Sequence, residues 1–169
     1  MKAKFGFFLL LVFLVGMLSS CGLSVPRPEV KSGEFDFSVT YEFNGEIKTV
    51  SGVYVCEYDG TERGLYGCFR SWKGYIKDYE VKDKLEIGTT DDGGTILLIT
   101  GLYPEYFMGD DTAGHDGAPT MKLMICYPEN EHGETKVESD MQVIEEDYGA
   151  RIVNYEYDEP IQNSFGLFK

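Results

Sequence analysis

Histidine, tryptophan and basic residues are scarce in this chain of 169 residues. It has two histidines, one tryptophan, and 15 lysine and arginine residues against 29 aspartate and glutamate residues, for a formal net charge of −14. The phosphate backbone of nucleic acids repels such an acidic protein, so we expect no nucleic-acid binding. The same charge predicts a well-solvated exterior and repulsion from anionic lipid surfaces.

The shortage of histidine limits which catalytic mechanisms the chain can use. His115 and His132 stand in polar, glycine-flanked contexts, AGHDG and NEHGE. Serine or cysteine nucleophiles need a neighbouring base, and the chain has no Gly-x-Ser-x-Gly motif and no phosphate- or dinucleotide-binding glycine motif. A zinc site is not expected, because no two cysteines are two residues apart and the histidines are distant in sequence. An enzyme is therefore the less favoured interpretation.

One uncharged apolar run occupies residues 5–18, after Lys2 and Lys4. It is shorter than the roughly 20 residues of a membrane-spanning helix and has the length of a signal-peptide core. Leu18-Ser19-Ser20-Cys21 follows and resembles the lipobox of bacterial lipoproteins. The resemblance implies that Cys21 is lipidated and becomes the first residue of the mature chain, and two acyl chains anchor a protein stably. The alternative is an ordinary signal peptide cut near Ser20.

These features predict three segments. Residues 1–20 are expected to be a lipoprotein signal peptide, and residues 21–33 a lipidated cysteine with an extended tether stiffened by Pro26 and Pro28. Residues 34–169 are expected to fold as one β-rich domain. The predicted location is the extracytoplasmic face of the cell membrane, with the membrane as a partner through the N-terminal lipid.

The start of the domain predicts a β-hairpin. Apolar and polar residues alternate strictly over residues 34–43, as on a half-buried strand. Asn44-Gly45 follows and is typical of a type I′ turn. A two-residue loop pairs Phe43 with Glu46, and hence Val39 with Val50 and Phe35 with Tyr54.

Further strands are predicted along the rest of the chain. The second strand is expected to continue to Tyr58, with a turn at residues 59–64, and later strands at residues 65–76, 84–90, 95–100, 122–127 and 150–157. Asp91-Asp92-Gly93-Gly94 indicates a hairpin turn, residues 165–168 are expected to close an edge, and residues 141–146 are the best candidate for a helix. The predicted fold is all-β, an antiparallel sandwich or barrel of about 8–10 strands.

Besides Cys21, the cysteines are Cys56, Cys68 and Cys126. Cys56 and Cys68 are symmetric about Glu62, so a cross-strand disulfide is one interpretation for an exported protein. The other is that all three cysteines are small core residues.

Two aromatic clusters are candidates for ligand binding. One contains Trp72 and Tyr75, and the other contains Tyr103, Tyr106 and Phe107. Such rings can contact a sugar or anchor a protein partner, although a small β-domain also uses aromatic residues in its core. Residues 104–120 look like a connection without regular structure, and long loops are often functional.

The same long connection holds a candidate cation site. The sequence GDDTAGHDG contains Asp110, Asp111, His115 and Asp116. Clustered carboxylates and glycines can bind Ca²⁺, although the spacing does not fit an EF-hand and exposed loops have the same composition. No other cofactor is expected.

A wider resemblance covers residues 51–110. The stretches SGVYVCEYDG, SWKGYI, TTDDGG and LYPEYFMGD are similar to small lipoproteins of Gram-positive gut anaerobes. That resemblance implies a cell-surface location and no particular chemistry. The leading hypothesis is a lipid-anchored binding or interaction module whose partner is a cell-wall glycan, a peptide or a protein. The alternatives are a small envelope hydrolase and a structural surface protein.

Overall fold

The computed structural model describes residues 25–65, 67–79, 83–110, 117–129 and 133–166. These residues form two four-stranded antiparallel sheets, a short pairing of β1 (Arg27–Pro28) with β10 (Phe165–Gly166), and two short helices. The predicted all-β fold is confirmed.

The first sheet has the strand order β4-β3-β2-β9. Its strands are β2 (Ser32–Phe43), β3 (Glu46–Gly64), β4 (Gly67–Ile76) and β9 (Ala150–Tyr157). The predicted hairpin register is confirmed, with Phe43 opposite Glu46 and Phe35 opposite Tyr54. Asn44 and Gly45 have φ values of 52° and 75°, as a type I′ turn requires.

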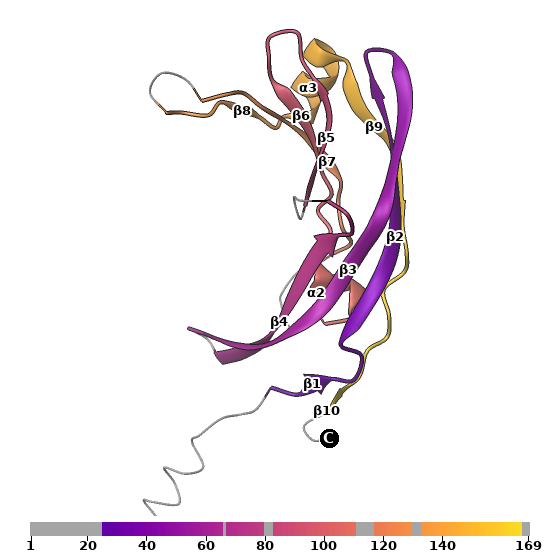
Figure 1. Ribbon diagram of the computed structural model, residues 1–169, viewed down its shortest axis with the longest axis vertical. Helices are drawn as coiled ribbons and strands as arrows, with labels where there is room; N and C mark the ends of the chain where they lie inside the picture. Colours follow the sequence, from indigo (N-terminus) through magenta and orange to yellow (C-terminus); the bar gives the residue numbers. More distant parts are fainter. Residues whose placement is uncertain (1–24, 66, 80–82, 111–116, 130–132, 167–169) are drawn as a thin grey trace, which may run out of the picture.

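The second sheet has the order β5-β6-β7-β8 and faces the upper half of the first sheet (Figure 1). Its strands are β5 (Lys84–Thr89), β6 (Thr95–Ile99), β7 (Lys122–Cys126) and β8 (Val137–Glu138). Helix α3 (Met141–Tyr148) lies at the same end and confirms the predicted helix. The Asp140 side chain accepts a hydrogen bond from the Gln142 amide, and Gly149 ends the helix at a φ of 59°.

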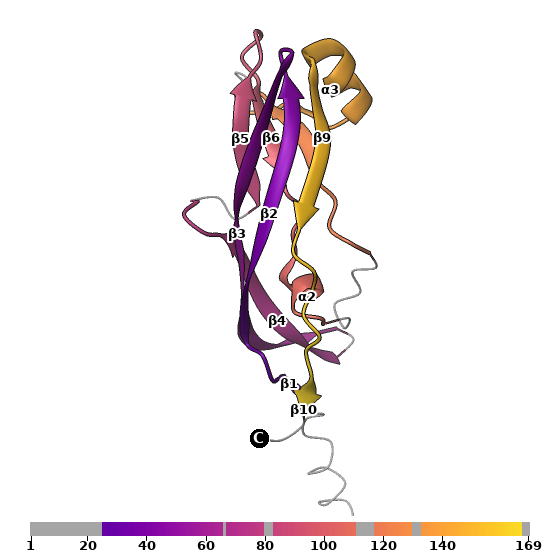
Figure 2. The same cartoon turned by 90° about the vertical axis from the view of Figure 1, so that its right-hand side faces the viewer.

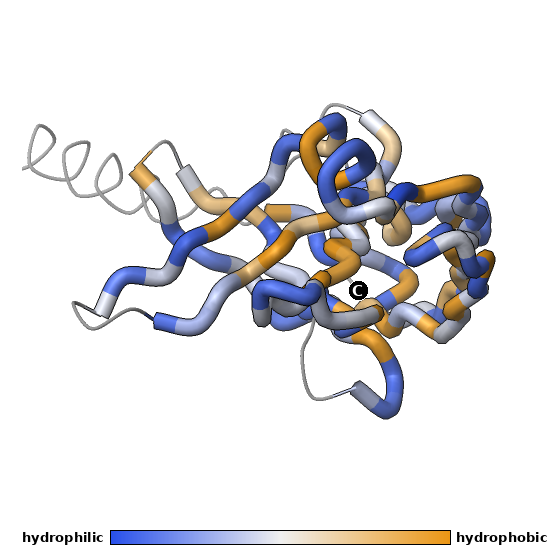
Figure 3. Tube along the Cα trace, turned by 90° about the horizontal axis from the view of Figure 1, so that it is seen from above, coloured by the Kyte–Doolittle hydropathy of each residue, from blue (hydrophilic) through white to orange (hydrophobic). Residues whose placement is uncertain are grey.

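The core runs along the concave side of the first sheet. Because strand residues alternate between faces, β2 turns one apolar set inward, and Figure 3 shows orange and blue positions alternating along the strands. In the upper half this set meets buried residues of the second sheet. In the lower half it meets the one-turn helix α2 (Pro104–Phe107), whose Phe107 ring lies 4.7 Å from the Phe35 ring and 5.6 Å from the Tyr54 ring, centroid to centroid.

The predicted turn at residues 59–64 is wrong. Strand β3 continues to Gly64, and the chain turns between Gly64 and Gly67. The pairing shifts register between Tyr58 and Gly60, and Gly60 has a φ of 111°. A β-bulge with a glycine at positive φ therefore absorbs the turn-like sequence without ending the strand.

The predicted tether is also too long. Arg27 and Pro28 pair with β10, Pro28 is buried, and the Pro26 carbonyl accepts a 3.1 Å hydrogen bond from Arg70 Nη1. Proline has no N–H to donate, but its carbonyl still accepts hydrogen bonds. The described residues from Val25 onward therefore belong to the folded domain.

The three cysteines in the domain are free. Because the hairpin turns at residues 64–67 and not around Glu62, Cys68 lies opposite Arg63 and Cys56 lies opposite Gly74. The Cys56–Cys68 disulfide interpretation is therefore wrong. Cys56 is a buried core residue, as the alternative predicted, whereas Cys126 is half-buried and Cys68 is exposed.

Candidate functional site

A buried ion pair joins β4 to the segment after α2. Strand alternation places Arg70 and Trp72 on one face of β4. Asp110 accepts hydrogen bonds from Arg70 Nε at 2.5 Å and Nη2 at 2.6 Å, and from Trp72 Nε1 at 2.8 Å. The Arg70 guanidinium also lies 3.9 Å from the centroid of the Phe165 ring. The Arg70–Asp110 pair therefore ties together β4, the segment after α2 and β10.

This pair changes the interpretation of two predicted site residues. Trp72 is 8% exposed and packs in the core. Asp110 is 3% exposed, and both of its carboxylate oxygens accept hydrogen bonds from protein donors. A carboxylate held in this way is poorly placed to bind a cation, so Asp110 is corrected from a predicted calcium ligand to an ion-pair partner. Asp111, His115 and Asp116 lie outside the described residues.

The other predicted aromatic residues separate into core and surface. Phe107 is fully buried and is a core residue, contrary to its prediction as a ligand contact. Tyr75 is half-buried on β4, where its hydroxyl donates to Glu57 at 3.4 Å. Tyr103 and Tyr106 are half-buried and line a common cavity.

This cavity, the α2 pocket, has a volume of about 350 Å³. It is lined by Tyr103, Glu105, Tyr106, Gly109, Asp110, Glu159, Pro160, Ile161 and Gln162. The Ile161 amide donates a 2.9 Å hydrogen bond to the Phe107 carbonyl, which holds the two walls together. Gly109 has a φ of 61°, and a Cβ there would lie 2.5 Å from the Ile161 carbonyl oxygen, so this close approach requires glycine.

Four tyrosines extend from the α2 pocket along β9. The rings of Tyr103, Tyr106, Tyr157 and Tyr155, here called the tyrosine row, have successive centroid separations of 5.8, 6.1 and 6.3 Å. The Tyr103 hydroxyl donates to the Gly117 carbonyl. Burial, followed by the neighbouring Tyr106, raises the pKa of Tyr157 to about 12. Tyr157 is therefore uncharged at neutral pH.

The acidic character of the α2 pocket comes mainly from two glutamates, because the third carboxylate in its lining, Asp110, is paired with Arg70. Glu105 lies on α2 and is half-buried, and Glu159 lies on the opposite wall and is exposed. Among the described residues, the lining includes no lysine, arginine, histidine, serine or cysteine. The pocket can therefore accept hydrogen bonds from hydroxyl or ammonium groups.

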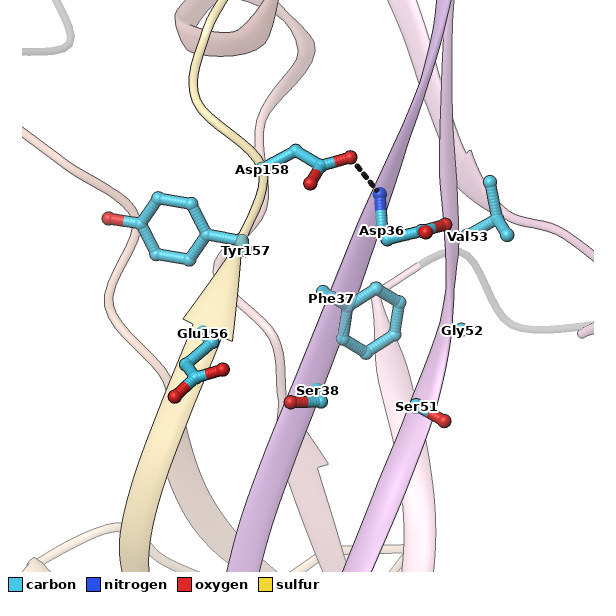
Figure 4. A pocket seen from close by; sticks show the side chains of 9 residues that line it. All are labelled: Asp36, Phe37, Ser38, Ser51, Gly52, Val53, Glu156, Tyr157 and Asp158. Atoms are coloured by element: carbon cyan, nitrogen blue, oxygen red, sulfur yellow. Dashed lines mark hydrogen bonds between the residues drawn. The ribbon is translucent and has the colours of Figure 1, made fainter.

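A larger hollow of about 490 Å³ lies on the outer face of the first sheet (Figure 4). Asp36, Ser38, Ser51, Glu156 and Asp158 contribute to its polar lining, and Asp158 Oδ2 accepts a 2.8 Å hydrogen bond from the Asp36 amide. Phe37 also lines this hollow, but its side chain is only 3% exposed. We favour the α2 pocket because two tyrosine rings and two glutamates line it from facing segments, whereas this hollow is a more open depression across one sheet.

A smaller hollow of about 290 Å³ lies at the opposite end, between Asp91, Asp92 and Asp147. The hydrogen bond from the Thr90 hydroxyl is the largest effect that lowers the pKa of Asp92, and Tyr127 also donates to this carboxylate at 3.1 Å. The described residues contain no group of three or more His, Cys, Asp or Glu side chains arranged to hold a metal ion. We assign no cation to this hollow.

Sequence reasoning missed Glu105, Glu159, Tyr155 and Tyr157 as neighbours of the predicted tyrosines. Pro104 at the first helical position was an available signal for α2, but no local pattern links α2 to residues 159–162.

Both histidines lie outside the described residues, so the hydrolase alternative stays a prediction. No helix within the described ranges has the length and apolar character needed to cross a membrane. No protein-family model, curated protein or solved structure matches this chain at a significant level.

Proposed function

We propose that the chain is a lipid-anchored binding module of the cell envelope that holds a neutral or basic ligand in the α2 pocket. One observation carries the proposal: Tyr103 and Tyr106 converge with Glu105 and Glu159 on a single cavity. Binding sites commonly combine apolar or aromatic walls with a few polar groups that fix orientation. The α2 pocket has this composition.

The lining defines the chemistry of the ligand. Tyrosine rings offer apolar faces to C–H groups, and tyrosine hydroxyls and carboxylates accept hydrogen bonds. Glu105, Glu159 and the Arg70-paired Asp110 line the pocket, and the described lining holds no cationic side chain, so an anionic ligand is disfavoured. The volume of about 350 Å³ fits one sugar unit or one amino-acid side chain. A longer chain would continue along the tyrosine row, so we propose a cell-wall glycan or a basic peptide.

The lipid anchor is supported by the sequence around Cys21 and by the start of the fold. Pro26, whose carbonyl is held by Arg70, lies five positions after Cys21. At about 3.3–3.6 Å per residue, this segment reaches at most about 18 Å. A chain lipidated at Cys21 would therefore hold the domain close to the membrane and not at the end of a long stalk.

Thermal unfolding of the full chain in detergent tests ligand binding. The panel contains cell-wall glycan fragments, a lysine-rich peptide and an acidic peptide as the charge control. A ligand at about 100 times its dissociation constant stabilises the folded state by roughly 2.7 kcal/mol. We expect a rise in melting temperature with a glycan or the basic peptide, and none with the acidic peptide.

Substitutions then locate the site. Tyr103→Ala and Glu159→Gln should abolish the ligand-dependent shift, because each removes a group from the pocket wall. Tyr79→Ala is the matched control, since Tyr79 is 46% exposed and does not line the pocket. A shift that persists unchanged in both pocket variants would refute the assignment of the site.

The anchor has a separate test. Cys21→Ala should abolish incorporation of a fatty-acid probe into the chain in growing bacteria and should leave the signal segment uncleaved. Cys68→Ala is the control, because Cys68 is also accessible but lies inside the domain. Equal labelling of the Cys21→Ala chain and the unsubstituted chain would contradict lipidation at Cys21.

A further inference from the structure

We propose that the turn between β3 and β4 inserts into the surface of the bilayer beside the lipid anchor, so that the chain contacts the membrane at two points. This inference rests on the proposed anchor at Cys21. The inserting residues, here called the hairpin tip, are Leu65, Cys68 and Phe69. They belong to the first sheet and not to the α2 pocket.

The hairpin tip exposes apolar side chains of the kind that are usually buried in a folded domain. Leu65 is 97% exposed, Phe69 is 40% exposed, and Cys68 is exposed. A Cβ atom on Gly64 would lie 2.9 Å from Phe69 Cε1, so the ring packs over the glycine and stays at the end of the hairpin. Neighbouring exposed apolar residues at the end of an element are typical of a surface that contacts a protein or a membrane.

The hairpin tip lies at the end of the molecule from which the proposed anchor leaves. Figures 1 and 2 both place the β3–β4 hairpin at the end that holds β1 and β10. Arg70 directly follows Phe69 in β4, and its Nη1 donates to the Pro26 carbonyl at 3.1 Å. Arg70 therefore fixes the base of the hairpin tip to Pro26, near the first described residue of the chain.

The reach of the segment from Cys21 to Pro26 matches the distance by which the hairpin tip projects from Pro26. Residues 21–26 span at most about 18 Å when fully extended. Leu65 lies beyond Arg70 by a few residues of paired strand, which rise about 3.3 Å each, so the hairpin tip projects on the order of 10–15 Å from the Pro26 contact. A lipidated Cys21 and the side chain of Leu65 can therefore reach one membrane plane together.

The charge at this end is less one-sided than at the opposite end, and the nearby anchor selects the bilayer as the occupant. The chain carries a net charge of −14, which opposes approach to anionic lipid. Exposed Arg63 and Glu62 both flank the hairpin tip, and exposed Arg27, Glu29 and Lys31 lie on or beside β1, so charges of both signs are present. The opposite end carries Asp91, Asp92 and Asp147 around one hollow. The domain would therefore turn its apolar hairpin tip toward the lipid and the three aspartates of the opposite end away from it.

Fluorescence quenching by lipids tests the insertion with the full lipidated chain. The chain, carrying Cys126→Ser, is labelled at Cys68 with a polarity-sensitive fluorophore and reconstituted into vesicles of phosphatidylcholine and phosphatidylglycerol. Cys56 should stay unlabelled, because it is fully buried and burial raises its thiol pKa to about 12. Spin-labelled lipids should quench the label, and its emission should shift to shorter wavelength.

The matched control carries the label at the opposite end. Ile47 lies on the β2–β3 hairpin and is 68% exposed, so Ile47→Cys combined with Cys68→Ser and Cys126→Ser gives an accessible site far from β1. Its label should be neither quenched nor shifted. In the chain labelled at Cys68, Leu65→Ser should reduce quenching, whereas Ile47→Ser should leave it unchanged.

Flotation of the vesicles separates the two proposals. A chain that floats while its Cys68 label stays unquenched retains the anchor and overturns insertion of the hairpin tip. A spectral shift without lipid quenching indicates contact between copies of the chain and also overturns the insertion. Quenching that is unchanged by Leu65→Ser also overturns the insertion of the hairpin tip. A chain that fails to float overturns the lipid anchor, and this inference with it.

Discussion

Removal of the Asp110 carboxylate should destabilise the domain more than removal of a surface carboxylate on the β3–β4 hairpin that carries its partner Arg70. Asp110→Ala deletes the acceptor of two guanidinium hydrogen bonds from Arg70 and of one indole hydrogen bond from Trp72. The side chains of Arg70 and Asp110 are 4% and 1% exposed. Water therefore has little access to replace the lost acceptor.

The magnitude follows from this burial. Removal of one member of a buried ion pair costs about 3–5 kcal/mol, because the desolvation of the other member is no longer compensated. Arg70 keeps the Pro26 carbonyl and the Phe165 ring in the variant, so we expect the lower half of that range. Since domains of this size are stable by about 5–15 kcal/mol, the variant loses a large share of its stability. Replacing both partners, with Arg70→Met and Asp110→Leu, should cost less than the single change.

Urea unfolding measures this difference directly. Trp72 is the sole tryptophan, so its fluorescence reports the transition, and linear extrapolation gives the free energy of unfolding. Asp59→Ala is the matched control, because Asp59 pairs with Lys73 on the same hairpin at 2.7 Å but is 39% exposed. The control should change the free energy of unfolding far less than Asp110→Ala, because water screens the exposed pair. An Asp110→Ala variant within about 1 kcal/mol of the unsubstituted chain would refute the energetic role assigned to the pair.

Three further predictions concern the core, the N-terminal segment and pH. Gly74→Ala should lower the melting temperature and cost about 1–3 kcal/mol, because its Cβ would lie 1.8 Å from the Tyr54 hydroxyl; an unchanged melting temperature would contradict this packing. A chain that begins at Gly33 should unfold at a lower urea concentration than one that begins at Val25, because it lacks the β1–β10 pairing; equal midpoints would show that β1 contributes nothing. Burial raises the pKa of Cys56 from 9.0 to about 12, so the unfolded chain loses this proton first and the free energy of unfolding should fall as the pH rises from about 9 toward 12. Urea titrations at several pH values check this slope, which should be smaller in Cys56→Ala.

Local patterns predicted the first hairpin because two independent signals agreed. The alternation of residues 34–43 specifies which face is buried, and Asn44-Gly45 specifies the turn and therefore the register. The second hairpin had only one local signal. Gly60 at a φ of 111° suits a turn or a bulge equally, and the extended partner strand β4 decides for the bulge. That decision depends on pairing between strands, so the sequence around Gly60 does not contain it.

The candidate site was only partly predictable for a similar reason. Tyr106 and Phe107 are adjacent on α2, yet one lines the α2 pocket and the other is fully buried. Their difference comes from the orientation of a single helical turn against the curled first sheet. Arg70 and Asp110 are 40 positions apart, and no periodic pattern relates them. Long-range packing therefore set which aromatic and acidic residues are structural and which face a ligand.

Asp110 also determines how the binding tests must be interpreted. It lines the α2 pocket, and through Arg70 it is linked to the Pro26 carbonyl at the proposed anchor end. A substitution of Asp110 would therefore disturb the pocket wall, the ion pair and the attachment of the N-terminal segment together, and loss of ligand binding in that variant would not locate the site. Glu159 lies on the opposite wall and is exposed, so Glu159→Gln should abolish the ligand response while leaving the free energy of unfolding nearly unchanged. That separation of binding from stability would assign the ligand to the α2 pocket itself.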